Sequence, residues 1–137
     1  MRISEAIALG RTLIQPLAGV HLTGDQTQGC AWGMVQMAAG RDNMQALHIA
    51  SNRIFLTLPC GCTGNIIKGG MTLGRSTGRE ALDIAIVHLF NDHVMTKKDW
   101  SMEKLIDWLA TVEPADPEEV QAEPVKEVVT DEVYSLP

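Results

Sequence analysis

Helix-breaking residues gather in the middle of this chain, and they constrain its fold more than any other feature. Between positions 59 and 74 they are Pro59, Gly61, Gly64, Gly69, Gly70 and Gly74. In a helix interior a glycine costs about 1 kcal/mol and a proline about 3 kcal/mol relative to alanine. The apolar residues on either side of Gly69-Gly70 favour two short strands instead. We therefore expect a small glycine-rich β-hairpin, with the turn Cys60-Gly61-Cys62 at its base.

The residues before this insert carry helix signals. Ser4 is expected to cap a first helix, because its hydroxyl is able to accept a hydrogen bond from a free backbone amide. An apolar helix is predicted from about Cys30 to Ala39, followed by Gly40 in the position that glycine favours after a helix. Asp42 and Gln45 have the spacing of a capping box and predict the start of a third helix.

The residues after the insert predict two more helices. Thr77 and Glu80 again have the spacing of a capping box, which places the start of a long apolar helix at about residue 77. Ser101 is expected to cap the last helix. Trp100 and Leu105 stand on either side of that cap at the spacing of a hydrophobic staple. These signals predict helices packed around one core on both sides of the insert.

The fold class predicted from these signals is mainly α (α+β). We expect a compact helical domain over residues 1–112 with the hairpin as an insert. Residues 113–137 differ in charge, since they hold eight acidic residues and one lysine for a net charge of −7. Residues 1–112 hold ten basic and nine acidic residues, a net charge of +1. An acidic segment with several prolines is typical of an extended interaction arm.

This acidic arm also carries apolar side chains that could contact a partner. They are Val125, Val128, Val129, Val133, Tyr134 and Leu136. Such a segment is able to add a strand to the edge of a partner's sheet or to lay an apolar side into a groove. We therefore expect residues 113–137 to bind a protein partner or a second copy of the chain.

Composition argues against several other classes of protein. The nearly neutral body disfavours nucleic acid as a partner, because neutralising phosphates requires clustered cations. No apolar run is long enough to cross a bilayer, and the first residues lack the pattern of a signal peptide. Three cysteines, an odd number, fit a reducing compartment better than a disulfide framework. We expect a cytoplasmic protein or a component of a larger assembly.

Four side chains of the types that bind zinc form the first candidate site. Cys60, Cys62, His88 and His93 could supply a tetrahedral set of two thiolates and two imidazoles. However, residues five apart on a regular α-helix point about 140° away from each other. Both histidines reach one ion only if the helix loosens around Asn91-Asp92, as a tightened last turn would allow. The alternative is that His88 is a core histidine bonded to a backbone carbonyl and that the two thiols are free.

Cys30 forms the second candidate site. It is predicted to start a helix, where the backbone amides and the helix dipole lower the pKa of a thiol. His88 or His93 could then act as a base, with Asp92 or Asn91 orienting it, as in cysteine hydrolases. The alternative is a buried cysteine that behaves as a small apolar residue.

Three stretches of the chain resemble a group of small bacterial and phage proteins of unknown function. They are the opening ISEAI, the Cys-Ala-x-Gly from Cys30 to Gly33, and the His-Leu-x-x-x-His from His88 that precedes Trp-Ser-x-Glu-x-Leu-Ile-Asp-Trp. The resemblance covers residues 1–112 in order. The chain departs from the group's pattern at Phe90-Asn91 and by an insertion, VMTKK, before Trp100. The resemblance implies a shared fold unit and a phage origin, and it implies no activity.

Three functional hypotheses follow. The sequence favours a non-enzymatic, phage-derived component of an assembly, located in the cytoplasm or in a phage particle, that engages its partner through the acidic arm. The alternative is a zinc-stabilised regulatory adaptor, built on the four cysteine and histidine ligands, which could also contact nucleic acid. The third is a hydrolase that depends on Cys30.

Overall fold

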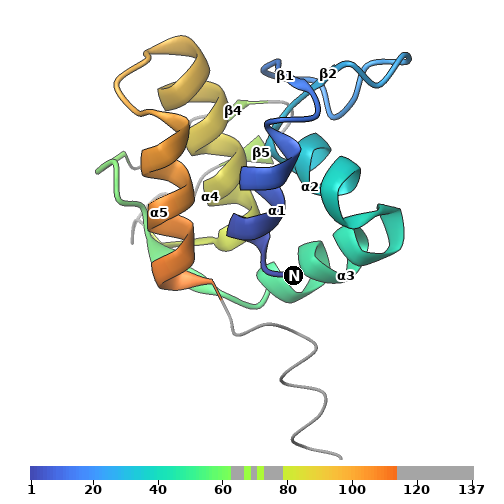
Figure 1. Cartoon of the computed structure of the whole chain (residues 1–137). Helices are drawn as coiled ribbons and strands as arrows, with labels where there is room; N and C mark the ends of the chain where they lie inside the picture. Colours follow the sequence, from blue (N-terminus) through green and yellow to red (C-terminus); the bar gives the residue numbers. More distant parts are fainter. Residues whose placement is uncertain (63–66, 69–70, 73–78, 114–137) are drawn as a thin grey trace, which may run out of the picture.

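The computed structural model describes residues 1–62, 67–68, 71–72 and 79–113 (Figure 1). Its helices are α1 (Ile3–Gly10), α2 (Ala31–Ala39), α3 (Arg41–Ser51), α4 (Leu82–His88), η1 (Leu89–Thr96) and α5 (Met102–Val112). Its strands are β1 (Gln15–Pro16), β2 (Gln28–Gly29), β3 (Phe55–Thr57), β4 (Ile67–Lys68), β5 (Met71–Thr72) and β6 (Arg79–Ala81). The predicted mainly helical fold is confirmed.

The strands form three two-stranded sheets. β1 pairs with β2 in parallel, whereas β3 pairs with β6 and β4 pairs with β5 in antiparallel fashion. In the β4–β5 pair, Ile67 lies opposite Thr72 and Lys68 opposite Met71, so the hairpin predicted around Gly69-Gly70 is present. Those two glycines themselves, like residues 114–137 of the predicted arm, lie outside the described residues.

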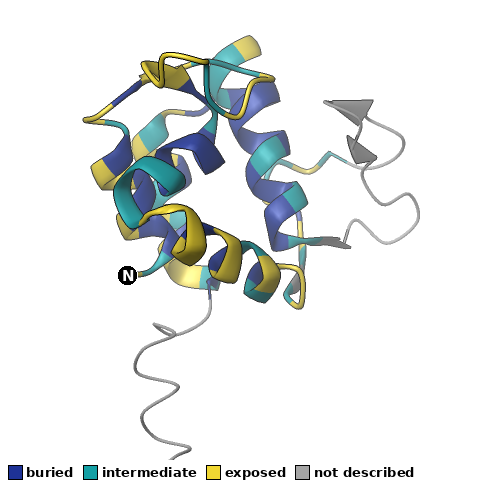
Figure 2. Cartoon of the chain, turned by 90° about the vertical axis from the view of Figure 1, so that its right-hand side faces the viewer, coloured by how far each residue is buried: buried dark blue, intermediate teal, exposed yellow. Residues whose placement is uncertain are grey.

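The core lies between the helices, which turn their buried faces inward (Figure 2). Its largest fully buried side chains include Ile3, Ile7, Met34, Leu82, Ile86, Leu89, Phe90, Leu105 and Leu109. Most of them repeat at intervals of three or four residues, the spacing that aligns side chains on one helix face. In the described part of the chain, no helix is both long and apolar enough to span a membrane.

Two glycines allow the backbone around α2 to pack unusually closely. A Cβ atom on Gly10 of α1 would lie 2.1 Å from the carbonyl oxygen of Met34, in α2. A Cβ atom on Gly33 of α2 would lie 2.0 Å from the carbonyl oxygen of His21. α2 is therefore held between two backbone segments at distances that exclude any side chain.

The beginning and the end of the described chain are tied together by buried polar contacts. Glu113, which follows α5 and is 9% exposed, accepts hydrogen bonds from the backbone amide of Ser4, at 2.8 Å, and from its hydroxyl. The Nε atom of Arg2 lies 3.1 Å from the same carboxylate. The residue before α1 is Arg2, so the prediction that Ser4 caps this helix was wrong. The Ser4 hydroxyl bonds a residue 109 positions away instead.

Of the other predicted helix caps, the one at Ser101 is confirmed, whereas those at Asp42 and Glu80 were wrong. Ser101 precedes α5 and its hydroxyl accepts a hydrogen bond from the amide of Lys104 at 3.0 Å, as predicted. Helix α3 begins at Arg41 without a side-chain cap, so Asp42 does not cap it. Glu80 lies in β6, opposite Leu56, and α4 begins after that strand. In β6 the backbone N–H and C=O groups form hydrogen bonds with β3, in place of those that a first helical turn would have formed.

We predict that Gly10→Ala and Gly33→Ala each destabilise the protein. The added Cβ would overlap a backbone oxygen that no side-chain rotation moves away, and overpacking of this kind costs about 1–3 kcal/mol. For a domain of this size, that corresponds to a fall in Tm of roughly 4–12 °C. Gly24→Ala is the matched control, since its Cβ meets nothing within 4 Å. Equal Tm values for all three variants, measured by circular dichroism, would contradict the close packing of α2.

Candidate metal centre

The first two candidate ligands lie in a turn that follows β3. The amide of Gly61 donates to the carbonyl of Leu58 at 3.3 Å, with Pro59 in the second position of the turn, where proline is favoured. Gly61 has φ of +78°, a conformation that costs other residues free energy. This turn brings the half-buried thiols of Cys60 and Cys62 into one cluster.

The other two candidate ligands lie on the central helix, which is not α-helical throughout. His88 ends α4, and His93 lies in η1, a π-helix. In a π-helix the backbone bonds run from residue i to i+5, as the amide of Lys97 bonds the carbonyl of Asp92 at 2.8 Å. Residues five apart are therefore about one turn apart, and both histidines face the same side. The helix does loosen at this point, as the site requires, but through a wide π-helical segment and not through a tightened last turn.

Two of the separations among the four candidate ligand atoms are close to those of a zinc site. The Sγ atom of Cys60 lies 3.4 Å from Nε2 of His88, and that of Cys62 lies 3.5 Å from Nε2 of His93. Tetrahedral zinc, with Zn–S of about 2.3 Å and Zn–N of about 2.0–2.1 Å, places such atoms about 3.6 Å apart. All four atoms lie within 4.8 Å of one another, so closing on an ion would shorten the longest separation by roughly 1 Å.

Carboxylates contact the far side of both imidazole rings. The Nδ1 atom of His93 lies 3.0 Å and 3.2 Å from the two oxygens of Asp99. The Nδ1 atom of His88 lies 2.9 Å from an oxygen of Asp92, a distance suited to an ion pair although the angle is not that of a hydrogen bond. Histidines that bind metal almost always carry such a partner, which fixes the tautomer with Nε2 free to bind.

The environment favours neutral forms of two of the ligands. Burial raises the pKa of the Cys60 thiol to about 11. Burial also lowers the pKa of His88, although Asp92 acts in the opposite direction. Outside the cluster, the hydrogen bond from His93 lowers the pKa of the exposed Asp99 carboxyl group. A metal ion would therefore meet His88 as a neutral imidazole, the form that binds, and would displace a proton from the Cys60 thiol.

Sequence reasoning identified all four ligands, and the structure brings all four together, where they could hold a metal ion such as zinc. The alternative of a core histidine is partly right, because His88 is only 3% exposed. Its contacts, however, are a thiol and a carboxylate, and not a backbone carbonyl. Sequence reasoning missed Asp99, which lies in the loop between η1 and α5, where no helical spacing links it to His93.

The second candidate site is only partly assembled. Cys30 does precede α2, as predicted. The Nε2 atoms of His88 and His93, its two proposed bases, instead face the thiols of Cys60 and Cys62. A Cys30-dependent hydrolase stays a prediction, as does partner binding by Val125, Val128, Val129, Val133, Tyr134 and Leu136, which lie outside the described residues.

Comparisons with known proteins do not bear on the candidate metal centre. Comparison with protein-family models, with curated proteins and with solved structures gave no match. The resemblance to small bacterial and phage proteins therefore stays a prediction.

We predict that Asp99→Asn weakens metal binding by about 10- to 100-fold, the usual effect of removing a carboxylate that orients a histidine ligand. The measurement is competition for Zn²⁺ against a chelator of known affinity. Asp107→Asn, which removes the same charge from an exposed position on α5, is the control. Equal affinities for the two variants would mean that the contact between Asp99 and His93 does not support metal binding.

Proposed function

We propose that this chain is a zinc-stabilised adaptor, in which Cys60, Cys62, His88 and His93 bind one structural zinc ion. The observation that carries the proposal is the pairing of each thiol with the Nε2 atom of one histidine, at 3.4 and 3.5 Å. Either pair alone could be a thiol–imidazole hydrogen bond. Two adjacent pairs, each with a carboxylate behind the ring, have the composition and spacing of a Cys₂His₂ zinc site.

The ligand set favours a structural role for the ion over a catalytic one. Catalytic zinc keeps three protein ligands and leaves a position for water or substrate, whereas structural zinc is closed by four. Here the protein offers four ligands, and both histidines are only 3% exposed. The ion would therefore hold parts of the chain together.

Zinc would join the glycine-rich insert to the helical body. The insert lies between Cys62 and His88 in the sequence. Among the described residues next to the insert, a second, small apolar cluster contains two buried side chains, Leu58 and Ala85, with half-buried Leu56, Ile84 and Trp108 around them. Because the ligands come together only in the folded chain, the free energy of zinc binding adds to the free energy of folding.

The adaptor part of the proposal comes from the sequence. Residues 113–137 carry the net negative charge of the chain together with apolar side chains suited to contact a partner protein. Zinc binding would stabilise the helical domain that carries such an arm. This role needs no reaction at the metal.

We predict that the protein purified without chelators contains one zinc ion per chain and that removing zinc lowers its Tm. At a free zinc concentration 1,000 times Kd, binding contributes about 4.1 kcal/mol to the free energy of unfolding. That corresponds to a difference in Tm on the order of 10 °C or more. The measurements are elemental analysis and thermal unfolding before and after dialysis against a chelator. Co²⁺ in place of zinc should give the visible absorption of a tetrahedral site with thiolate ligands.

Substitutions separate the ligands from the other cysteine and histidine residues. Cys62→Ser and His93→Ala should each lose the zinc and the Co²⁺ spectrum. Cys30→Ser is the matched control for the thiol, and serine is a favoured residue at the helix start where Cys30 lies. His21→Ala is the control for the imidazole, since His21 is exposed and bonds Gln36. Less than half a zinc ion per chain in the unmodified protein would refute the proposal.

A further inference from the structure

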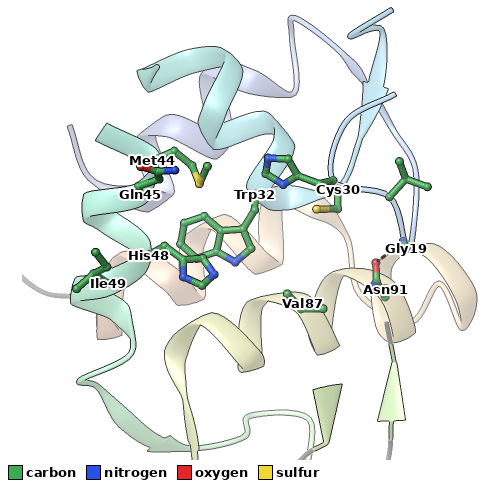
Figure 3. Close-up of a pocket in the computed structure, with 11 residues that line it drawn as sticks. Gly19, Cys30, Trp32, Met44, Gln45, His48, Ile49, Val87 and Asn91 are labelled. Atoms are coloured by element: carbon green, nitrogen blue, oxygen red, sulfur yellow. Dashed lines mark hydrogen bonds between the residues drawn. The ribbon is translucent and has the colours of Figure 1, made fainter. Parts of the chain in front are cut away.

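A cavity of about 600 Å³ lies on another side of the central helix (Figure 3). Trp32 of α2, Met44 and His48 of α3, and Val87 and Asn91 of α4 and η1 contribute to its walls. None of the four candidate metal ligands lines it. Cavities of 300–1,000 Å³ with mostly apolar walls are typical of sites for small organic molecules.

One wall carries a hydrogen-bond donor that the protein does not use. Trp32 is 3% exposed, and its indole Nε1 atom has no hydrogen-bond partner among the described residues. Its ring lies 4.7 Å, between centroids, from the ring of His48. In Figure 3 the indole nitrogen turns toward His48 and Val87, both of which line the cavity. A buried donor without a partner costs free energy, which a ligand with an acceptor atom would recover.

The rest of the lining is mostly apolar and favours a neutral ligand. No lysine, arginine, aspartate or glutamate is among the described residues that line the cavity. Two of the few large apolar side chains that the described surface exposes stand at its edge. They are Val20, 38% exposed, and Ile49, 58% exposed. Exposed apolar side chains beside a cavity are typical of a binding site.

We propose that this cavity binds a neutral small organic molecule, with an apolar body and a carbonyl-type oxygen that accepts a hydrogen bond from Nε1 of Trp32. The apolar body would lie against Met44, Val87 and Ile49. Asp83, 4% exposed, lies 3.5 Å from Nε2 of His48, the residue whose imidazole lies beside the indole. This site is separate from the zinc centre and does not depend on it.

Three naphthalene derivatives of similar shape test the proposal on the full-length protein. They are 2-acetylnaphthalene, which is neutral with an acceptor, 2-isopropylnaphthalene, which has no acceptor, and 2-naphthoate, which is charged. Isothermal titration calorimetry should show that the ketone binds about tenfold more tightly than the other two. In ¹⁵N-resolved NMR spectra the ketone alone should shift the indole N–H signal of Trp32 as a new hydrogen bond does. Equal affinities, or an unmoved signal, would overturn the proposal.

Two variants assign the effect to the cavity. Trp32→Phe keeps an aromatic ring and removes the donor, so the ketone should bind no better than the hydrocarbon. Ile49→Asp puts a charge at the edge of the cavity from an exposed position and should weaken ketone binding at least tenfold. Leu13→Asp, at another exposed apolar residue that does not line the cavity, should change nothing. If Trp32→Phe fails to fold, the comparison of Ile49→Asp with Leu13→Asp still tests the site. Equal effects of those two changes on ketone affinity would refute it.

Discussion

The burial of the central helix is the constraint on which the remainder of the structure depends. Leu82, Ile86, Leu89 and Phe90 are all fully buried, and together they fix how α4 and η1 are rotated in the core. With that rotation fixed, His88 and His93 face the turn that carries the two thiols. Val87 and Asn91 face another side, toward α2 and α3. One helix thus contributes to the metal centre and to the cavity.

The two sites differ in the contacts that their polar side chains make within the protein. In the candidate metal centre each imidazole contacts a thiol on one side and a carboxylate on the other, and a metal ion that replaces a thiol proton could be held there. In the cavity the indole of Trp32 has no partner among the residues described, although Asn91 nearby accepts a hydrogen bond from the amide of Gly19 at 3.2 Å. The first arrangement suits a metal ion, whereas the indole donor suits a ligand with an acceptor atom.

Much of the fold could be predicted from the sequence, because its signals are local. The cap at Ser101, the glycine after α2 and the breakers around the hairpin act over a few residues, and the structure contains all three features. Predictions failed where a distant group competed. The Ser4 hydroxyl bonds Glu113, and Glu80 belongs to a strand because β3 lies beside it. The four metal ligands could be found by residue type, but the π-helix that aligns two of them depends on packing that no local spacing encodes.

The π-helix also determines how the metal centre relates to the length of the chain. Each turn of η1 holds more residues than a turn of α-helix, so this stretch is equivalent to an α-helix with an extra residue. With one residue fewer between His88 and His93, the two histidines would stand four apart, and an ordinary α-helix would already place them on one face. A π-helix with five residues from one histidine to the next and an α-helix with four would therefore place the two imidazoles in a similar way. Proteins with the shorter spacing could hold the same ion in a regular helix, and a search for related sites should allow both spacings.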